Sequence, residues 1–209
     1  MKSVLLSIKP KYCELIASGK KTVEIRKNRP KIDVPFKVYI YCTKNGLKIY
    51  GDGKCYVTDN FNLLNEKAEK GFEKTSKMRK WNCKVIGEFV CDGIYSWGAD
   101  DLTYGTYYAS DDELNDAFIT YEELWNYGKG KTIYAWHISD LVIYDKPKEL
   151  SEFYKEDFDE VYSNWEDLFS IGVPTGCSVR YPPEPKKEDY TIQRPPQSWC
   201  YVEEMNDNG

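Results

Sequence analysis

The residues best suited to chemistry in this sequence form one short pattern, G-x-K-x-x-E-x-R, made by Gly19, Lys21, Glu24 and Arg26. Alternation along a strand would put Glu24 and Arg26 on one side, and Lys21, just before them, can reach over the same edge. Two cations around one carboxylate leave an excess of positive charge, which suits a phosphate or the electron-rich edge of a base. We therefore predict that the three side chains converge on one cleft, with Lys21 and Glu24 as candidate catalytic residues and Arg26 as a binding residue.

A simpler interpretation makes Glu24 and Arg26 an ordinary ion pair on the wet face of a sheet, where such pairs contribute little to stability. The lysine also leaves two uses open. A protonated Lys21 would hold an anion or a carbonyl, whereas a desolvated Lys21 would have a lowered pKa and could act as a base or a nucleophile. A neighbouring Glu24 favours the protonated form, and for this reason we place binding before catalysis.

Other candidates lie outside this pattern. Lys9 is expected at the rim of the cleft, and Trp199, which follows Pro-Pro-Gln-Ser, could stack on a base or close one end of the fold. His137 is the only histidine, so any imidazole acid–base chemistry must use it, although a single histidine on a strand is more often structural. A basic patch could contact phosphates or simply be solvated; its residues are Lys77, Arg79, Lys80 and Lys84.

Hydrophobic periodicity and turn residues predict the elements that carry these side chains. A helix is expected to begin at Pro10 and to end at Gly19. Capping boxes at Ser110 and Thr120 predict two more short helices. Strands are expected over 4–8, 22–26, 36–42, 85–94 and 131–144, the last of them bent near Ser139 and Asp140, with a hairpin over 48–57.

Changes in composition divide the chain. We predict a first domain over 1–145 that contains a charged insertion at about 60–84. After residue 145 the sequence becomes acidic and then rich in proline, which disfavours helix interiors and central strands. Residues 146–209 are therefore expected to form an extended arm, whose end, about 195–204, packs back on the first domain.

The motif at 19–26 in its strand–helix–strand setting resembles the ASCH domain family, in a subgroup common in bacterial and prophage genomes. The segments 6–10, 87–92, 134–138 and 195–202 resemble the same family. The resemblance implies an α+β fold, a PUA-like small mixed β-barrel with flanking helices and a cleft beside the first helix. The Pro-rich C-terminal arm would be added to it.

The resemblance also implies RNA or a modified nucleoside as the partner. At least one small ASCH enzyme hydrolyses an amide in N4-acetylcytidine with a lysine, a threonine three residues later and a distant carboxylate. Lys21 matches the lysine, but Glu24 stands where the threonine would be, Thr22 faces the other way from Lys21, and Asp116 is the nearest candidate for the carboxylate. We predict a binding protein; an amidohydrolase, or a nuclease, and an accessory protein-interaction module that uses the acidic surface and the arm stay open as alternatives.

Composition limits the remaining classes. The 209 residues have a formal net charge of −5, which argues against strong non-specific binding to duplex DNA. No apolar run is long enough to predict a membrane span or a signal peptide. Seven cysteines without a C-x-x-C motif, together with one histidine, predict neither a disulfide framework nor a metal site. We expect a cytoplasmic protein with reduced thiols and no cofactor; the oligomeric state stays open.

Overall fold

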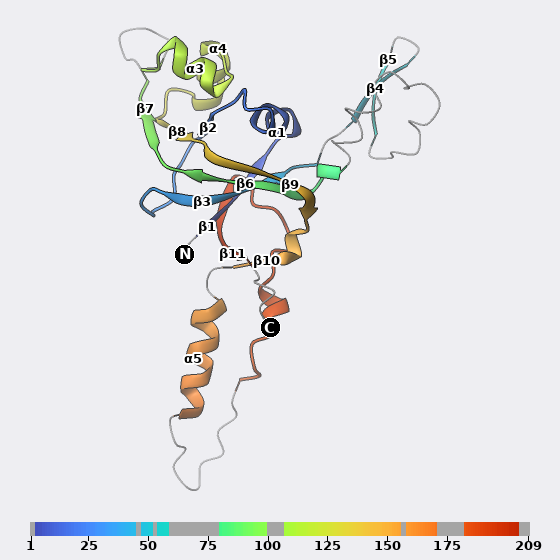
Figure 1. Cartoon of the computed structure of the whole chain (residues 1–209), viewed down its shortest axis with the longest axis vertical. Coiled ribbons are helices and arrows are strands. Elements are labelled where there is room, and N and C mark those ends of the chain that lie inside the picture. Colours follow the sequence, from blue (N-terminus) through green and yellow to red (C-terminus); the bar gives the residue numbers. More distant parts are fainter. Residues whose placement is uncertain are drawn as a thin grey trace.

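The computed structural model describes residues 3–44, 47–51, 54–58, 80–99, 107–155, 158–170 and 182–204. At its centre lies a six-stranded mixed sheet in the order β10-β11-β1-β3-β6-β9 (Figure 1). β1 and β3 are parallel, and the other neighbouring pairs are antiparallel. The strands are β1 Ser3–Ile8, β3 Phe36–Cys42, β6 Lys84–Cys91, β9 Ser139–Lys148, β10 Phe153–Tyr154 and β11 Trp199–Glu204.

A second, antiparallel sheet has the order β2-β8-β7 and curls against the first (Figure 1). Its strands are β2 Val23–Arg26, β7 Ile94–Trp97 and β8 Ile133–His137. β6 continues into β7 across Asp92 and Gly93, and β8 continues into β9 across Ile138, so two chain segments serve both sheets. The bend predicted near Asp140 is confirmed, since that residue has a φ of 46°. The single strand predicted over 85–94 is instead two strands. The predicted hairpin is confirmed as β4 Leu47–Gly51 and β5 Lys54–Thr58.

Helix α1, Pro10–Ala17, follows β1 and turns the chain back toward β2. Pro10 occupies its first turn, where a missing N–H costs nothing. Cys13 and Ile16 are buried, on the side that packs into the core. Gly19 ends the turn with a φ of 70°, a left-handed conformation that glycine adopts without strain. The predicted strand–helix–strand unit is thus confirmed.

Helices α3, Asp111–Ala117, and α4, Tyr121–Gly128, cover the second sheet (Figure 1). Both predicted capping boxes are present. The Ser110 and Thr120 hydroxyls each accept a hydrogen bond from the backbone N–H three residues later, and the glutamate at that position accepts one from the backbone N–H of the cap residue. Two short capped helices therefore form directly over β2, and their buried residues Leu114 and Leu124 share a core cluster with β2.

The segment expected to be an extended arm contains a 13-residue helix, α5 Phe158–Ser170, which projects away from the sheets (Figure 1). Apolar residues at 158, 161, 162, 165 and 168 have the spacing of one helix face, a signal that the acidic composition obscured. Two short 3₁₀ helices, η3 Leu150–Glu152 and η4 Lys187–Tyr190, complete this part. The division at residue 145 stays a prediction, and residues 60–79 of the charged insertion, with Lys77 and Arg79, lie outside the described residues.

The core lies on both faces of the six-stranded sheet. Between the two sheets, Leu6, Ile40, Phe89 and Trp136 are almost wholly buried. On the opposite face Leu5 and Tyr39 pack against Phe153 and Val202 from the C-terminal part. Among the described helices, none is both long enough and apolar enough to span a membrane.

Burial of thiols and phenols makes stability sensitive to alkaline pH. Desolvation raises the pKa of Cys91 to about 12, whereas an unfolded thiol ionises near ~8.5 to 9. The stabilising contribution is complete below that value and is lost as the pH rises toward 12, because the unfolded chain releases its proton first. We expect Cys91 alone to reduce the free energy of unfolding by about 2 kcal/mol between pH 8 and pH 10.5.

Urea unfolding at several pH values checks this expectation. The Cys91→Ala variant should lose less stability between pH 8 and pH 10.5 than the unsubstituted protein, whatever its stability at neutral pH. Parallel pH profiles for the two proteins would contradict the burial of a neutral thiol.

Candidate functional site

A cavity of about 780 Å³ lies where the end of β1, helix α1 and strand β2 meet. The turn between α3 and α4, Tyr127 of α4 and the segment 196–198 before β11 complete its walls. This volume falls within the roughly 300–1,000 Å³ typical of small-molecule sites. Elements from both sheets and from three parts of the chain thus enclose one space.

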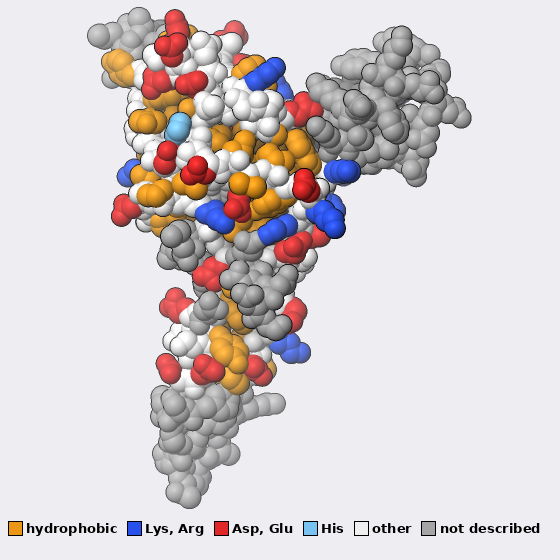
Figure 2. Space-filling model, viewed as in Figure 1, with side chains coloured by type: hydrophobic (Ala, Val, Ile, Leu, Met, Phe, Trp, Pro, Cys, Tyr) orange, Lys and Arg blue, Asp and Glu red, His pale blue; other side chains and the backbone are white. Residues whose placement is uncertain are grey.

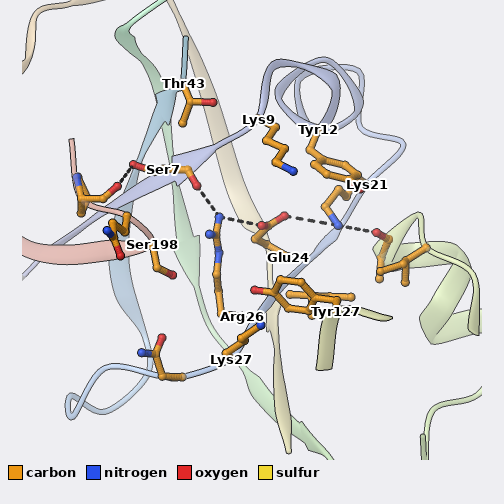
Figure 3. Close-up of a pocket in the computed structure, with 16 residues that line it drawn as sticks. Ser7, Lys9, Tyr12, Lys21, Glu24, Arg26, Lys27, Thr43, Tyr127 and Ser198 are labelled. Atoms are coloured by element: carbon orange, nitrogen blue, oxygen red, sulfur yellow. Dashed lines mark hydrogen bonds and ion pairs between the residues drawn. The ribbon is translucent and has the colours of Figure 1, made fainter. Parts of the chain in front are cut away.

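Lys21, Glu24 and Arg26 form a continuous row in this cavity (Figure 3). The Arg26 Nη2 lies 2.9 Å from Glu24 Oε1, and the Lys21 Nζ lies 3.4 Å from Glu24 Oε2. All three are buried: Arg26 is 8% exposed, Glu24 is 6% exposed and Lys21 is 4% exposed. The structure therefore brings the three predicted residues together in a buried cluster, which differs from the ion pair on a wet face that we considered.

Strand parity places Glu24 and Arg26 in the row. Val23 and Ile25, at the alternate positions of β2, belong to the core cluster beneath α3 and α4. Lys21 reaches the row from the turn after α1, where its backbone N–H donates to the carbonyl of Leu15. Its Nζ also donates to the carbonyl of Ala117 at the end of α3, at 2.5 Å. The position of Lys21 thus depends on both helices.

Arg26 connects the two sheets. Its Nη2 donates to the Ser7 carbonyl on β1 at 2.8 Å, and the Ser7 hydroxyl donates to the Pro196 carbonyl at 2.7 Å. The Nε of Arg26 is buried without a hydrogen-bond partner among the described residues. An unsatisfied buried donor costs about 1–3 kcal/mol.

Burial changes the pKa of Lys21 more than the neighbouring carboxylate does. Desolvation lowers the pKa of Lys21; the charge and hydrogen bond of Glu24 oppose this effect, and the positive charge of Arg26 adds to it. Glu24 favours the protonated form, as expected from the sequence, but the removal of the amine from water has the larger effect on the pKa of Lys21. Deprotonation of this lysine is easier than that of an ordinary one.

The rim of the cavity is also cationic. Lys9 and Lys27 line it, and both are exposed. Neither lysine forms an ion pair with any residue in the part of the chain that the structure describes. The charged lining residues are thus four cations and one carboxylate, in a chain whose formal net charge is −5.

Two tyrosines form the aromatic walls, on either side of the buried row (Figure 3). The Lys21 Nζ lies 5.3 Å from the ring centroid of Tyr12, and the Lys27 Nζ lies 4.9 Å from that of Tyr127. Burial raises the pKa of Tyr127, so its phenol stays neutral. Sequence reasoning did not identify either tyrosine; Tyr127 lies far along the chain, and no local pattern distinguishes it from the other tyrosines.

Trp199 does not line the cavity. Its indole N–H donates to the Asn28 Oδ1 at 2.9 Å, and its ring packs near Trp136 and Tyr201. Asn28 does line the cavity, so Trp199 supports one wall from behind. Any contact between Trp199 and a ligand stays a prediction.

The remaining candidates lie elsewhere. His137 makes a 2.6 Å contact from Nδ1 to the Asp92 Oδ1, outside the cavity lining, and this partner lowers the pKa of Asp92. Asp116 is exposed and contributes its backbone carbonyl, which accepts from the N–H of Thr22. Lys84 of the basic patch pairs with Glu149. The described residues contain no group of three histidine, cysteine or acidic side chains that could hold a metal ion.

Comparison with known proteins agrees with the resemblance seen in the sequence. The model of the ASCH domain family matches residues 6–90, which include the end of β1, α1, β2 and the row at 21–26. Similarity to an ASCH domain is thereby found for residues 6–90. The family is PUA-like and is related to RNA-binding domains. No curated protein matches the chain.

Solved structures of ASCH from Zymomonas mobilis also match. The protein itself is 17% identical, with a TM-score of 0.47 over 96% of this chain and 87% of that one. A tyrosine-to-phenylalanine variant is 17% identical, with a TM-score of 0.48 over 97% and 91%. A serine-to-alanine variant is 15% identical, with a TM-score of 0.46 over 96% and 88%.

The buried row predicts a large effect of removing its one negative charge. Glu24→Gln keeps the shape of the side chain but leaves Lys21 and Arg26 buried without a counter-charge. We expect the free energy of unfolding to fall by about 3–5 kcal/mol at neutral pH, measured by urea denaturation.

Glu122→Gln is the matched control, because Glu122 is exposed on α4 and its change should stay within about 0.5 kcal/mol. Equal stabilities for the two variants would show that Glu24 does not compensate buried cations.

Proposed function

We propose that the cavity binds a nucleobase-bearing ligand, a nucleotide of single-stranded RNA or a modified nucleoside. One observation carries this proposal: four cationic side chains surround one carboxylate in a cavity of an otherwise acidic chain. A random distribution of the 29 basic and 34 acidic residues would give such a cavity nearly equal numbers of cations and carboxylates. The similarity of residues 6–90 to a family related to RNA-binding domains supports the same direction.

The arrangement offers a separate place for each part of a nucleotide. Lys9 and Lys27, exposed at the rim, suit a phosphate, which basic side chains hold without reading the base. The rings of Tyr12 and Tyr127 suit the face of a base, whose π-system stacks on aromatic side chains. The buried row offers charged donors and one carboxylate acceptor for the polar edge of the base.

Binding to a panel of probes tests the proposal. The panel contains cytidine, cytidine monophosphate, N4-acetylcytidine and a ten-nucleotide single-stranded RNA, and calorimetry measures each affinity. Loss of a stacking ring costs about 1–3 kcal/mol per base, so Tyr127→Ala should weaken binding by about 5- to 150-fold. Tyr127→Phe, which keeps the ring, should bind close to normally.

Tyr95→Ala is a further control, because Tyr95 is 55% exposed on β7 and does not line the cavity. Binding of none of the probes, or equal binding by Tyr127→Ala and the unsubstituted protein, would reject the proposal.

One observation favours a second candidate, an amidohydrolase acting on N4-acetylcytidine or a similar small amide. Burial lowers the pKa of Lys21, and a neutral amine can accept a proton. In this scheme Lys21 takes a proton from water, and the resulting hydroxide adds to the acetyl carbonyl. The protonated Lys21 then returns the proton to the departing N4 nitrogen as the C–N bond breaks, which gives cytidine and acetic acid. Arg26 would stabilise the oxyanion that forms.

Chromatography of N4-acetylcytidine incubated with the protein decides this candidate. Turnover should rise with pH as the Lys21 amine loses its proton, and Lys21→Arg should abolish it, because an arginine stays protonated. Lys146→Ala, at an exposed position of β9 outside the cavity, should have no effect. Activity that is absent, or that survives in Lys21→Ala, would leave binding as the proposed function.

A further inference from the structure

A second hollow, of about 400 Å³, lies along the loop between β2 and β3. Its lining consists of residues 29–34 together with Ile94 of β7. Lys27 and Asn28, the two residues before it, line the first cavity. The chain therefore passes without interruption from the wall of one hollow to the wall of the other, and a ligand that leaves the cavity along this wall meets the loop.

Three exposed cations follow one another on this path, Lys27, Arg29 and Lys31. None of them forms an ion pair within the described parts of the chain, and Asp33 is the one carboxylate that lines the second hollow. Surface cations of a protein with net charge −5 have many possible acidic neighbours. A run of three without such a neighbour leaves a local positive strip that is open to an anion.

Contacts with β11 hold the loop in place. The indole N–H of Trp199 donates to the Asn28 side chain at 2.9 Å, and the backbone N–H of Lys31 donates to the Tyr201 hydroxyl at 2.7 Å. Neither hydrogen bond uses the charged group of Lys27, Arg29 or Lys31, so these groups can contact a ligand. A loop that is fixed before binding loses less conformational entropy when it binds, so its cations are more effective.

We propose that Lys27, Arg29 and Lys31 form a phosphate track for a single-stranded polynucleotide, one base of which occupies the cavity. This inference rests on the proposed function and names its ligand as a polymer: an isolated nucleoside would fill the cavity and leave the loop empty. Residues 27 to 31 span at most about 14 Å when fully extended, so the track holds only the phosphates next to the bound base. The acidic remainder of the protein disfavours a long duplex.

The decisive experiment compares two double variants on two kinds of probe. Arg29→Ala with Lys31→Ala removes cations of the track and keeps every residue of the cavity. Lys146→Ala with Lys186→Ala removes the same charge from exposed positions outside both hollows. The probes are cytidine monophosphate and ten-nucleotide single strands of RNA and DNA with the same sequence, each titrated at several salt concentrations.

We expect the track variant to bind both single strands about tenfold more weakly at 50 mM salt and to bind cytidine monophosphate within twofold of normal. The slope of log affinity against log salt should decrease in magnitude by about 1.4, since each phosphate contact on a single strand contributes about 0.7. The control variant should match the unsubstituted protein in the salt slope and in the ratio of its strand affinity to its mononucleotide affinity.

Three outcomes would overturn the track. Unchanged strand affinity and salt slope in the track variant, with normal mononucleotide binding, would reject the track and leave the proposed function intact. Polyglutamate, titrated as an additional polyanion probe, would show that the loop is a general anion-attracting surface if it bound as tightly as RNA. Binding of neither mononucleotide nor strand by the unsubstituted protein would reject the track and the proposed function together.

Discussion

The hydrogen-bonded ion pair between Arg26 and Glu24, extended by Arg26 to the carbonyl of Ser7, is the interaction on which the site depends. β2 and β1 belong to different sheets and share no backbone ladder. The Nη2 of Arg26 makes both contacts: it lies 2.9 Å from Glu24 Oε1 and donates to the Ser7 carbonyl at 2.8 Å, so one nitrogen joins a carboxylate of β2 to the backbone of β1. The cavity lies beside this contact, and Ser7, Glu24 and Arg26 all line it.

Burying these charges lowers the stability of the protein, and a cost of this kind points to a functional role for the cluster. Buried ion pairs seldom recover the full desolvation of their charges, and well-packed apolar residues often stabilise a protein more. Here the row contains three buried charges and one buried donor without a partner. Packing alone would not require such a cluster, and residues such as Val23 and Ile25 show that β2 supplies apolar side chains where only packing is needed. The buried charges thus agree with the proposal that a ligand enters the cavity.

Local signals in the sequence predicted those parts of the structure that local forces decide. The helix that begins at Pro10 and ends at Gly19, the caps at Ser110 and Thr120, and the parity of β2 all follow from a few neighbouring residues. These features suffice to bring the charges at 21–26 together. The tyrosine walls and the hydrogen bond to Ser7 were not predicted, because they join segments that are distant in the sequence. Helix α5 was not predicted either, because its acidic residues and the prolines beyond it obscured its apolar face. The lowered pKa of Lys21 could not be predicted either, because burial is a property of the whole fold.

The two hollows share an excess of positively charged side chains. The net negative charge of the protein repels polyanions, and salt screens this repulsion beyond about a Debye length. A ligand that carries phosphates is therefore attracted only close to Lys9, Lys27 and the loop that follows, within about a Debye length of the cations. Under the proposed function, this charge distribution disfavours indiscriminate binding to nucleic acid, and recognition depends on the base proposed to stack on Tyr12 or Tyr127. Selectivity then comes from the cavity, and the cations at its edge supply affinity only to a ligand already in register with it.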